Sequence, residues 1–237
     1  MPSAYRTYSL GETAIAIDFG NVIDEDINKF VIALFDWWKE NKITGIRDII
    51  PAYSSLTLVY DIEAIRNHSD DISAFEFVKK ILEASVKKVT RKKTSPSRQI
   101  EIPVCYDLSF APDLKFLAAK KNLPIEKAIE LHIGQTYRVY MIGFLPGFAY
   151  MGKVHKQISL PRKSNPRMHV DEGSVGIAGD QTGIYPMNSP GGWNIIGRTP
   201  VRLFDSKKSD PVLLHAGDEV QFIPINLKQF HLAKSKQ

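Results

Sequence analysis

The chain has 237 residues, of which 43% are hydrophobic and 24% charged, a composition typical of a globular protein with one large or two smaller domains. No apolar run approaches the roughly 20 residues that a membrane-spanning helix needs, and the first residues contain no apolar core of a secretion signal. The single cysteine, Cys105, excludes an intrachain disulfide, so we expect a cytoplasmic protein without membrane contact.

The formal net charge of +5 is unevenly distributed along the sequence. Six of the 31 basic residues lie between Lys87 and Arg98, and three more, Lys228, Lys234 and Lys236, lie near the C-terminus. The remainder has 22 basic and 26 acidic residues and is mildly acidic. We therefore expect a solvated basic linker and tail, and no nucleic-acid-binding surface.

The first part of the chain alternates strand and helix patterns. An apolar stripe with helical spacing predicts a helix over residues 27–38, with Asp24 as its N-cap. A second stripe predicts a helix over residues 75–86, with Ser69 or Asp70 near its start. Apolar residues spaced by two predict strands over residues 15–19, 46–50 and 56–60.

The resulting β-α-β-β-α order is most of a ferredoxin-like unit, which we assign to an α+β domain over residues 1–90. We expect residues 99–104 to supply its closing strand. The intervening segment is basic, contains a Ser-Pro pair and has almost no apolar residues, so we interpret residues 91–98 as a linker.

The composition changes in the second domain, residues 99–237. Two short helices are predicted, one opened by Pro112 and one running from Pro124 to His132. Ten of the 15 glycines then fall between Gly143 and Gly197. Many short apolar stretches separated by Gly and Pro favour a closed β-barrel or a sandwich, with strands expected at residues 137–142, 174–178, 193–196, 201–204 and 219–223.

The sequence lacks the common signatures of nucleotide and metal chemistry. It contains no P-loop, no Gly-rich dinucleotide turn after a strand, and no His-Glu-x-x-His pair. With six scattered histidines and one cysteine, we expect no metal site. Cys105 lies in a strand-like run without an adjacent cation, which favours a buried, unreactive thiol.

Four segments between residues 143 and 200 combine Gly, Pro, Arg and aromatic residues at unusual density. Glycine lets the backbone approach a ligand closely, and arginine offers a planar fork to a carboxylate or phosphate. These residue types suit a small anionic substrate, so the candidate catalytic residues are His132, Arg162, Arg167 and Arg198. The candidate substrate-binding residues are Phe144, Pro146, Gly147, Gln181, Thr182, Tyr185, Ser189, Gly192 and Trp193.

The same residues also have a purely structural explanation. A barrel rich in Gly and Pro needs them for its bends and turns. Phe148 and Trp193 suit packing better than stacking on a ligand, and His132 stands where a side chain interacts with the terminal carbonyls of a helix. From the residues alone, both interpretations stay open.

The four segments read GFLPGFAYMG, LPRKSNPR, GSVGIAGDQTGIYP and SPGGWNIIGRTP, and they are followed by LFD and GDEVQFIPI. Together with GETAIAIDFG, PAYSSLTLVYD and IEIPVCYD nearer the N-terminus, they resemble the KipI family over nearly the whole chain. That family includes the B subunit of 5-oxoprolinase and was formerly labelled allophanate hydrolase subunit 1.

The resemblance implies a small α+β N-terminal domain followed by a cyclophilin-like closed β-barrel. It also implies a share in the ATP-driven opening of the 5-oxo-L-proline lactam to L-glutamate, with ATP as co-substrate. The expected partners are the C subunit of 5-oxoprolinase, which is a related barrel protein, and its A subunit, which is of the LamB/YcsF type. Two alternatives stay open: inhibition of a sensor histidine kinase, and a role related to allophanate hydrolase or urea carboxylase.

One loop departs from the usual wording of the family. The family commonly reads Val-Pro-Ala-Gly-Ser-Val, whereas this chain has Asp171 and Glu172 in place of the proline and alanine. The change puts two negative charges beside the arginine-rich segments, so we expect it to alter how this loop meets a ligand.

Overall fold

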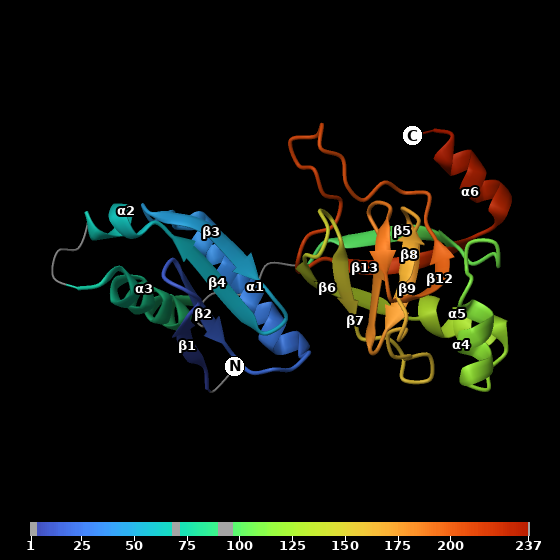
Figure 1. The fold of residues 1–237 in the computed structure, drawn as a ribbon, viewed down its shortest axis with the longest axis horizontal. Coiled ribbons are helices and arrows are strands. Elements are labelled where there is room, and N and C mark those ends of the chain that lie inside the picture. Colours follow the sequence, from blue (N-terminus) through green and yellow to red (C-terminus); the bar gives the residue numbers. More distant parts are fainter. Residues whose placement is uncertain (1–3, 68–71, 90–96, 237) are drawn as a thin grey trace. The chain divides into compact units, whose positions relative to one another are not determined.

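The computed structural model describes residues 4–67, 72–89 and 97–236. Contacts within the chain divide it into two compact units, Met1–Pro96 and Ser97–Gln237, whose elements are labelled in Figure 1. Most of the predicted linker at residues 91–98 lies outside the described residues.

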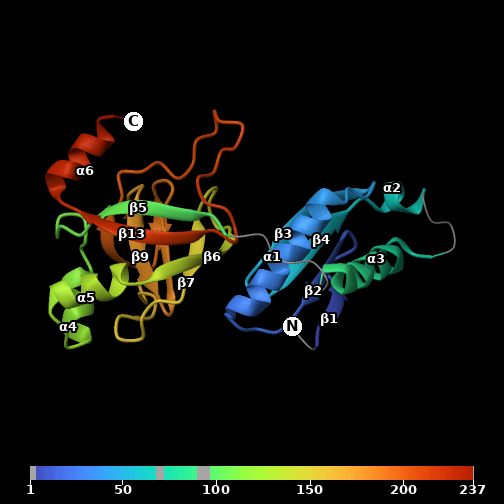
Figure 2. The same ribbon diagram turned by 180° about the vertical axis from the view of Figure 1, so that it is seen from behind.

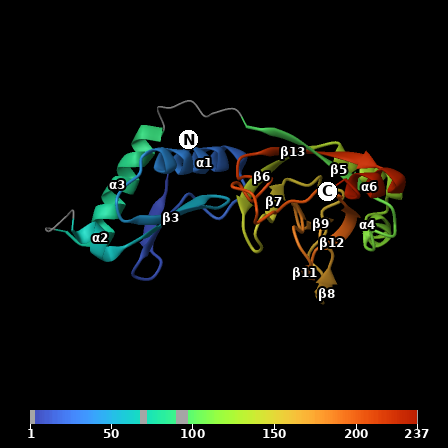
Figure 3. The ribbon, with the colours of Figure 1, turned by 90° about the horizontal axis from the view of Figure 1, so that it is seen from above.

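The first unit is built on one antiparallel sheet. The strand order is β1 (Arg6–Ser9), β2 (Ala14–Asp18), β4 (Ser55–Tyr60) and β3 (Ile46–Pro51). Figures 2 and 3 show α1 (Glu25–Glu40) and α3 (Ala74–Val89) on the same face of this sheet, and the short α2 (Ile62–Arg66) follows β4. The expectation of an α+β region in the first part of the chain is therefore confirmed.

The spacing of apolar residues and the N-cap predicted from the sequence explain why these strands and helices form where they do. Ile17 of β2 and Leu56 of β4 are fully buried and lie opposite each other in the ladder. Helix α1 begins after the predicted N-cap, Asp24, whose carboxylate accepts a hydrogen bond from the Ile27 N–H at 3.0 Å.

The two long helices of this unit, α1 and α3, are joined through a buried polar contact. The indole N–H of Trp38 in α1 donates a hydrogen bond to the Ser85 hydroxyl of α3 at 3.1 Å. The contact satisfies the one polar group of a large side chain that is otherwise packed in the core. The predicted cap residues of α3, Ser69 and Asp70, lie outside the described residues.

The sheet has a different fourth strand from the predicted one. The prediction that residues 99–104 close this sheet is wrong, because β5 (Gln99–Cys105) belongs to the second unit. Its Ile102 and Val104 are buried in the core of that unit. The edge position is taken by β1, whose sequence RTYS is mostly exposed and shows no apolar alternation by which it could be recognised.

The second unit contains a closed seven-stranded barrel, which confirms the predicted β-barrel. Fully buried Val139, Ile177 and Val220 contribute to its core. Helices α4 (Leu114–Lys120) and α5 (Ile125–Ile133) pack against each other beside it (Figure 1). The strands are, in barrel order, β10 (Gln181–Ile184), β7 (Ala149–Gly152), β6 (Thr136–Ile142), β13 (Glu219–Ile225), β5, β12 (Asn194–Arg198) and β9 (Ser174–Ala178).

Two further strands, β8 (Arg167–Val170) and β11 (Ser189–Gly191), pair with each other outside the barrel, as Figure 3 shows. The strand predicted at residues 201–204 is wrong, because only Phe204 pairs there, in an isolated bridge with Val212. Leu203 is buried in the barrel core, which accounts for the apolar pattern without a strand.

The basic tail predicted at the C-terminus is instead a helix, α6 (Leu227–Lys234). Asn226 and Gln229 form a capping box, in which each side chain accepts a hydrogen bond from the other residue's backbone N–H, at 2.9 and 2.8 Å. Phe230 is buried against Phe110, with ring centroids 4.4 Å apart. None of the helices in the described ranges is long and apolar enough to cross a membrane.

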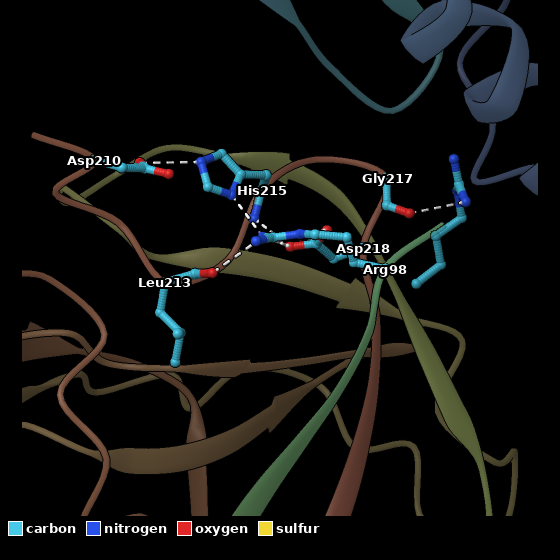
Figure 4. Close-up of polar contacts among 7 residues, drawn as sticks. Arg98, Asp210, Leu213, His215, Gly217 and Asp218 are labelled. Carbon is cyan, nitrogen blue, oxygen red and sulfur yellow. Dashed lines mark hydrogen bonds and ion pairs between the residues drawn. The ribbon is translucent and has the colours of Figure 1, made fainter. Parts of the chain in front are cut away.

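Arg98, the last residue of the predicted linker, is held by the barrel (Figure 4). Its guanidinium donates to the buried carboxylate of Asp218 through Nε at 2.8 Å and Nη2 at 2.5 Å. Nη2 also lies 2.6 Å from Nδ1 of His215 and 3.2 Å from the Leu213 carbonyl oxygen. The Arg98 carbonyl also accepts from the Glu219 N–H at 2.9 Å, and the Ser97 hydroxyl accepts from Arg138 of β6 at 3.3 Å, so contacts with the barrel already begin within the predicted linker.

We predict that trypsin cuts the linker within the basic stretch 91–93 and spares the bond after Arg98. Trypsin must take the basic side chain into its own pocket, whereas Arg98 is held by Asp218 and Gln99 is already part of β5. Mass spectrometry of the first C-terminal fragment is the measurement. Asp218→Asn should increase cleavage after Arg98, and a wild-type fragment that begins at Gln99 would contradict the prediction.

Candidate functional site

A pocket of about 170 Å³ lies between β8, β12 and the loop before α4. It contains two of the three candidate arginines, Arg167 and Arg198. Most of its lining is polar, which distinguishes it from the apolar interior of the barrel. The lining residues are Ser109, Phe110, Pro112, Arg167, His169, Val170, Asp171, Ser174, Ile195 and Arg198.

One wall of the pocket is fixed by the buried carboxylate of Asp113. Arg167 binds it with both terminal nitrogens, each at 2.7 Å, so that the two planar groups face each other as a fork. Lys163 Nζ lies 2.8 Å from Oδ1, and the backbone N–H of Ile195 donates to Oδ2 at 2.7 Å. Asp113 is 3% exposed, so this cluster of charges is largely withdrawn from water.

The pKa of Asp113 shows which physical effect dominates in this cluster. Burial acts to raise the pKa, because it disfavours the charged carboxylate. Hydrogen bonds from Arg167, Lys163 and the Ile195 N–H act in the opposite direction and prevail, so the pKa lies below its ordinary value. Asp113 is therefore an anion at neutral pH and holds Arg167 in place.

The opposite wall is formed by Arg198 at the end of β12. Its Nε donates to the Glu172 carbonyl at 2.8 Å, and Nη1 lies 3.0 Å from Oδ2 of Asp171. The guanidinium also lies over the Phe110 ring, 5.5 Å from its centroid. Arg198 is thus positioned by the loop 171–172 and by an aromatic face, and it lines the pocket.

The two acids that replace the usual proline and alanine of this loop form ion pairs at the rim of the pocket. Asp171 contacts Arg198 through one oxygen and His169 Nε2 through the other, at 2.8 Å. The Glu172 carboxylate lies 3.8 Å from Lys234 Nζ of α6. The departure therefore places a carboxylate directly on a candidate arginine.

Arg162 lies apart from the other two arginines and is not among the described residues that line the pocket. Its guanidinium is 5.8 Å from the centroid of the Trp193 ring. Tyr185 connects the two regions: burial raises its pKa, whereas the Trp193 N–H, Arg162 and, more weakly, Arg167 lower it. Trp193 and Tyr185 both pack against Phe148, at 5.4 and 5.3 Å between ring centroids. The aromatic residues thus form a packed cluster beneath Arg162.

The turn before β7 exposes Phe144, with 62% of its surface accessible and a positive φ of 69°. Gly147 in the same turn has φ of +80°, and a Cβ there would lie 3.2 Å from the Leu203 carbonyl oxygen, so the position favours glycine. Pro146 is exposed beside it. This turn contributes no residue to the described pocket.

Three further candidates have structural contacts of their own. Gln181 begins β10 and lies opposite Ala178 in the ladder. The Ser189 hydroxyl donates to the Pro190 carbonyl at 3.1 Å, and the Gly192 carbonyl accepts from the Lys163 N–H at 2.8 Å.

His132 and Thr182 lie inside the barrel and are both fully buried. The Thr182 hydroxyl donates to the Gly176 carbonyl at 3.0 Å, so its oxygen accepts from Nε2–H of His132, also at 3.0 Å. Nδ1 of His132 is then the acceptor for the Tyr106 hydroxyl at 2.8 Å. His132 also stacks on Phe222 at 4.7 Å. Every polar atom of its ring is therefore engaged in the core, away from the pocket.

The structure also identifies residues that sequence reasoning missed. Asp113 precedes α4 and resembles an N-cap, but its side chain makes no cap hydrogen bond and turns to Arg167 instead. Ser109 and His169 line the pocket although no motif singles them out, and Ser174 lines it although it was not among the candidate residues of its segment. Their common signal is position: each lies within a few residues of an element end, where a side chain can turn toward a cavity.

Cys105 is buried, as expected, and burial raises the pKa of its thiol. Within the described part of the chain, no group of three or more His, Cys, Asp and Glu side chains is arranged to hold a metal ion.

The buried His132 generates a pH prediction. Complete burial lowers its pKa from 6.5 to about 3, so between these values the unfolded chain takes up a proton that the folded chain refuses. Acidification hence favours unfolding. From this residue alone, we expect the free energy of unfolding of the barrel to fall by about 1.4 kcal/mol per pH unit between pH 6 and 4.

The measurement is equilibrium urea unfolding at several pH values for the wild type and His132→Gln. The variant loses hydrogen bonds and starts less stable at neutral pH, but it cannot take up this proton. As the pH is lowered, its free energy of unfolding should therefore fall less steeply than that of the wild type. The difference in slope should be about 1.4 kcal/mol per pH unit, which corresponds to one proton. Equal slopes in the two proteins would rule out a buried neutral His132.

Three comparisons place the chain among known proteins. The sequence profile of the family "Carboxyltransferase domain, subdomain C and D" matches residues 5–214. The B subunit of 5-oxoprolinase from Bacillus subtilis (strain 168) is 41% identical over 238 aligned residues, which cover 100% of this chain and 99% of that protein. The B subunit of 5-oxoprolinase from Escherichia coli O157:H7 is 35% identical over 223 residues, 92% of this chain and 95% of that protein.

A solved structure agrees with these relatives. TTHA0988 superposes with a TM-score of 0.77 and 34% identity over 90% of this chain. The chain spans 40% of the TTHA0988 polypeptide, which therefore has a longer part outside the match. The profile over most of the chain and the relatives over its full length show that the chain belongs to the carboxyltransferase-domain family, subdomains C and D, and within it to the family of 5-oxoprolinase B subunits.

Proposed function

We propose that this chain is the B subunit of an ATP-dependent 5-oxoprolinase, which opens 5-oxo-L-proline to L-glutamate together with partner subunits. The observation that carries the proposal is the full-length similarity to proteins named as B subunits of 5-oxoprolinase, which includes both units of the chain. The kinase-inhibitor and urea-carboxylase alternatives lack an observation of this strength. We place the complex in the cytoplasm, in keeping with the single buried cysteine.

The proposal extends to the architecture. We assign the first unit to a variant of the ferredoxin-like fold and the second to a cyclophilin-like barrel, joined by the basic linker at residues 91–98. The order β2-α1-β3-β4-α3 supports the first assignment, and the closed barrel supports the second. A likeness to cyclophilin gives no isomerase activity, because function resides in the site and not in the fold.

The chemistry explains why the reaction needs ATP. A γ-lactam is a stabilised amide with a poor amine leaving group, so water alone attacks it slowly. Phosphorylation of its carbonyl oxygen creates an activated imidate that water can attack. This step requires cationic groups that hold the substrate and the transferring phosphate, and arginine supplies both charge and a planar fork. Arg198 and Arg167 are the arginines that one pocket of this chain brings together.

The complex needs further subunits in this proposal. The chain contains no P-loop, and the Ser109 hydroxyl of the pocket donates at 2.6 Å to the Asp107 carboxylate, whose lowered pKa makes it a weak base. The additional length of TTHA0988 supports a partner that in some proteins is fused to this chain. We propose two partners: the C subunit of 5-oxoprolinase, which is a related barrel protein, and its A subunit, which is of the LamB/YcsF type. ATP is the co-substrate of the assembly.

We predict that the isolated chain does not hydrolyse 5-oxoproline and that turnover appears when the C and A subunits are added. The measurement is ATP-dependent formation of glutamate by the purified chain alone, by the partners alone, and by the mixture. Omission of any one component should abolish turnover. Glutamate formation by the isolated chain at the rate of the mixture would refute the proposal.

We also predict that Arg198→Lys lowers the turnover rate of the assembled complex about tenfold or more, which corresponds to about 1.4 kcal/mol. Lysine keeps the charge but loses the fork that binds two atoms at once. Arg202→Lys is the matched control, because Arg202 lies on the same unit in a loose, exposed pair with Asp205 at 3.9 Å. Normal turnover of Arg198→Lys would remove Arg198 from the site, and loss of assembly in a pull-down would assign it to an interface.

A further inference from the structure

One hydroxyl of the pocket wall has no hydrogen-bond partner among the described residues. Ser174, at the start of β9, is 5% exposed and lines the pocket. Its backbone is fully used, because the N–H donates to the Asp171 carbonyl at 3.1 Å and the carbonyl accepts from the Tyr185 N–H at 2.9 Å. No described residue makes a hydrogen bond with its hydroxyl. Since the residue lines the pocket, this hydroxyl is free to donate a hydrogen bond to a ligand there.

The two arginines of the pocket differ in their capacity for a ligand. Both terminal nitrogens of Arg167 are committed to Asp113, whose low pKa keeps it ionised. Arg198 has one terminal nitrogen on Asp171, and no described residue accepts a hydrogen bond from the other, Nη2. Arg198 is therefore the arginine of the pocket whose charge is less firmly held by a carboxylate, and a ligand carboxylate can bind it.

The Asp171 carboxylate already shows how a carboxylate meets this fork. Its Oδ2 lies 3.0 Å from Arg198 Nη1, while its Oδ1 lies 2.8 Å from His169 Nε2. The Asp171 side chain is 49% exposed, so it can leave Arg198 for water and still keep the contact with His169. Displacement of this carboxylate by another one is therefore inexpensive.

The size of the pocket limits the ligand further. Pockets for drug-sized molecules measure about 300–1,000 Å³, whereas this one measures about 170 Å³. The space suits a small ring with a carboxylate and is too small for a nucleotide. Phe110 supplies an apolar face beside the polar groups, as a small ring requires.

We propose that this pocket binds a small monocarboxylic acid whose carboxylate replaces that of Asp171 on Arg198. The hydroxyl of Ser174 donates a second hydrogen bond to the ligand. Asp171 is then an internal competitor that sets the affinity of the pocket. The inference rests on the proposed function in one respect, because 5-oxo-L-proline is the monocarboxylic acid chosen as the probe.

The test is a titration of the full chain with 5-oxo-L-proline, followed by two-dimensional NMR. Asp171→Asn should tighten binding about fivefold or more, because the competing charge is gone. Ser174→Ala should weaken binding by about the same factor, through loss of one hydrogen bond. Asp210→Asn is the matched control, since it also removes an exposed carboxylate paired to a histidine, and it should leave the affinity within about twofold.

Three results would overturn the inference. They are unchanged or weaker binding by folded Asp171→Asn, an equal gain in Asp210→Asn, and tighter binding of inorganic phosphate than of 5-oxo-L-proline. Failure of the proposed function gives a different pattern. Binding with the expected variant effects but no turnover of the reconstituted complex would refute only the function, and turnover without binding at this pocket would refute only the inference.

Discussion

The geometry of the pocket depends on one buried anion, the carboxylate of Asp113. It joins the fork of Arg167 on β8, the ammonium of Lys163 in the preceding loop, and the backbone of Ile195 in β12. These groups are 50 to 82 residues away from it in the sequence. A buried charge is costly unless opposite charges and hydrogen bonds surround it, so these three groups must stay close to the Asp113 carboxylate. The ion pair with Arg167 therefore holds the strand pair β8–β11 against the barrel.

The same unit contains a second polar system with the opposite character. His132, Thr182 and Tyr106 form a chain of neutral hydrogen bonds in the closed interior, where burial removes the charge of the imidazole. Outside the barrel wall, Arg167 and Arg198 form ion pairs with the carboxylates of Asp113 and Asp171. In a sequence, a histidine or threonine looks equally suited to catalysis whether it will be buried in a core or will line a pocket. The surroundings in the folded chain decide which of these polar groups can reach a ligand.

The spacing of apolar residues and the capping residues in the sequence were sufficient to predict much of the fold. Alternating apolar residues such as Ile17 and Leu56 identified the central strands, and the cap at Asp24 identified the start of α1. β1 was not predictable, because its polar sequence gains strand structure only from pairing with β2. α6 was hidden by its lysines, although the capping box of Asn226 was present in the sequence. For the site, the bends beside Arg167 and Arg198 gave a usable signal, whereas Asp113 and Ser174 depend on contacts between distant segments.

The barrel is closed by a parallel pairing between its first and last strands, with Gln99 of β5 opposite Glu219 of β13 across 120 residues. Until β13 leaves the ribosome, β5 lacks its seven-residue partner and exposes an unpaired edge that includes Ile102 and Val104. The first unit consists of elements that are contiguous in the chain, so it can fold while the barrel is still being synthesised. The barrel can therefore be closed only after β13 has been made, and we expect a pairing across so long a sequence separation to form slowly.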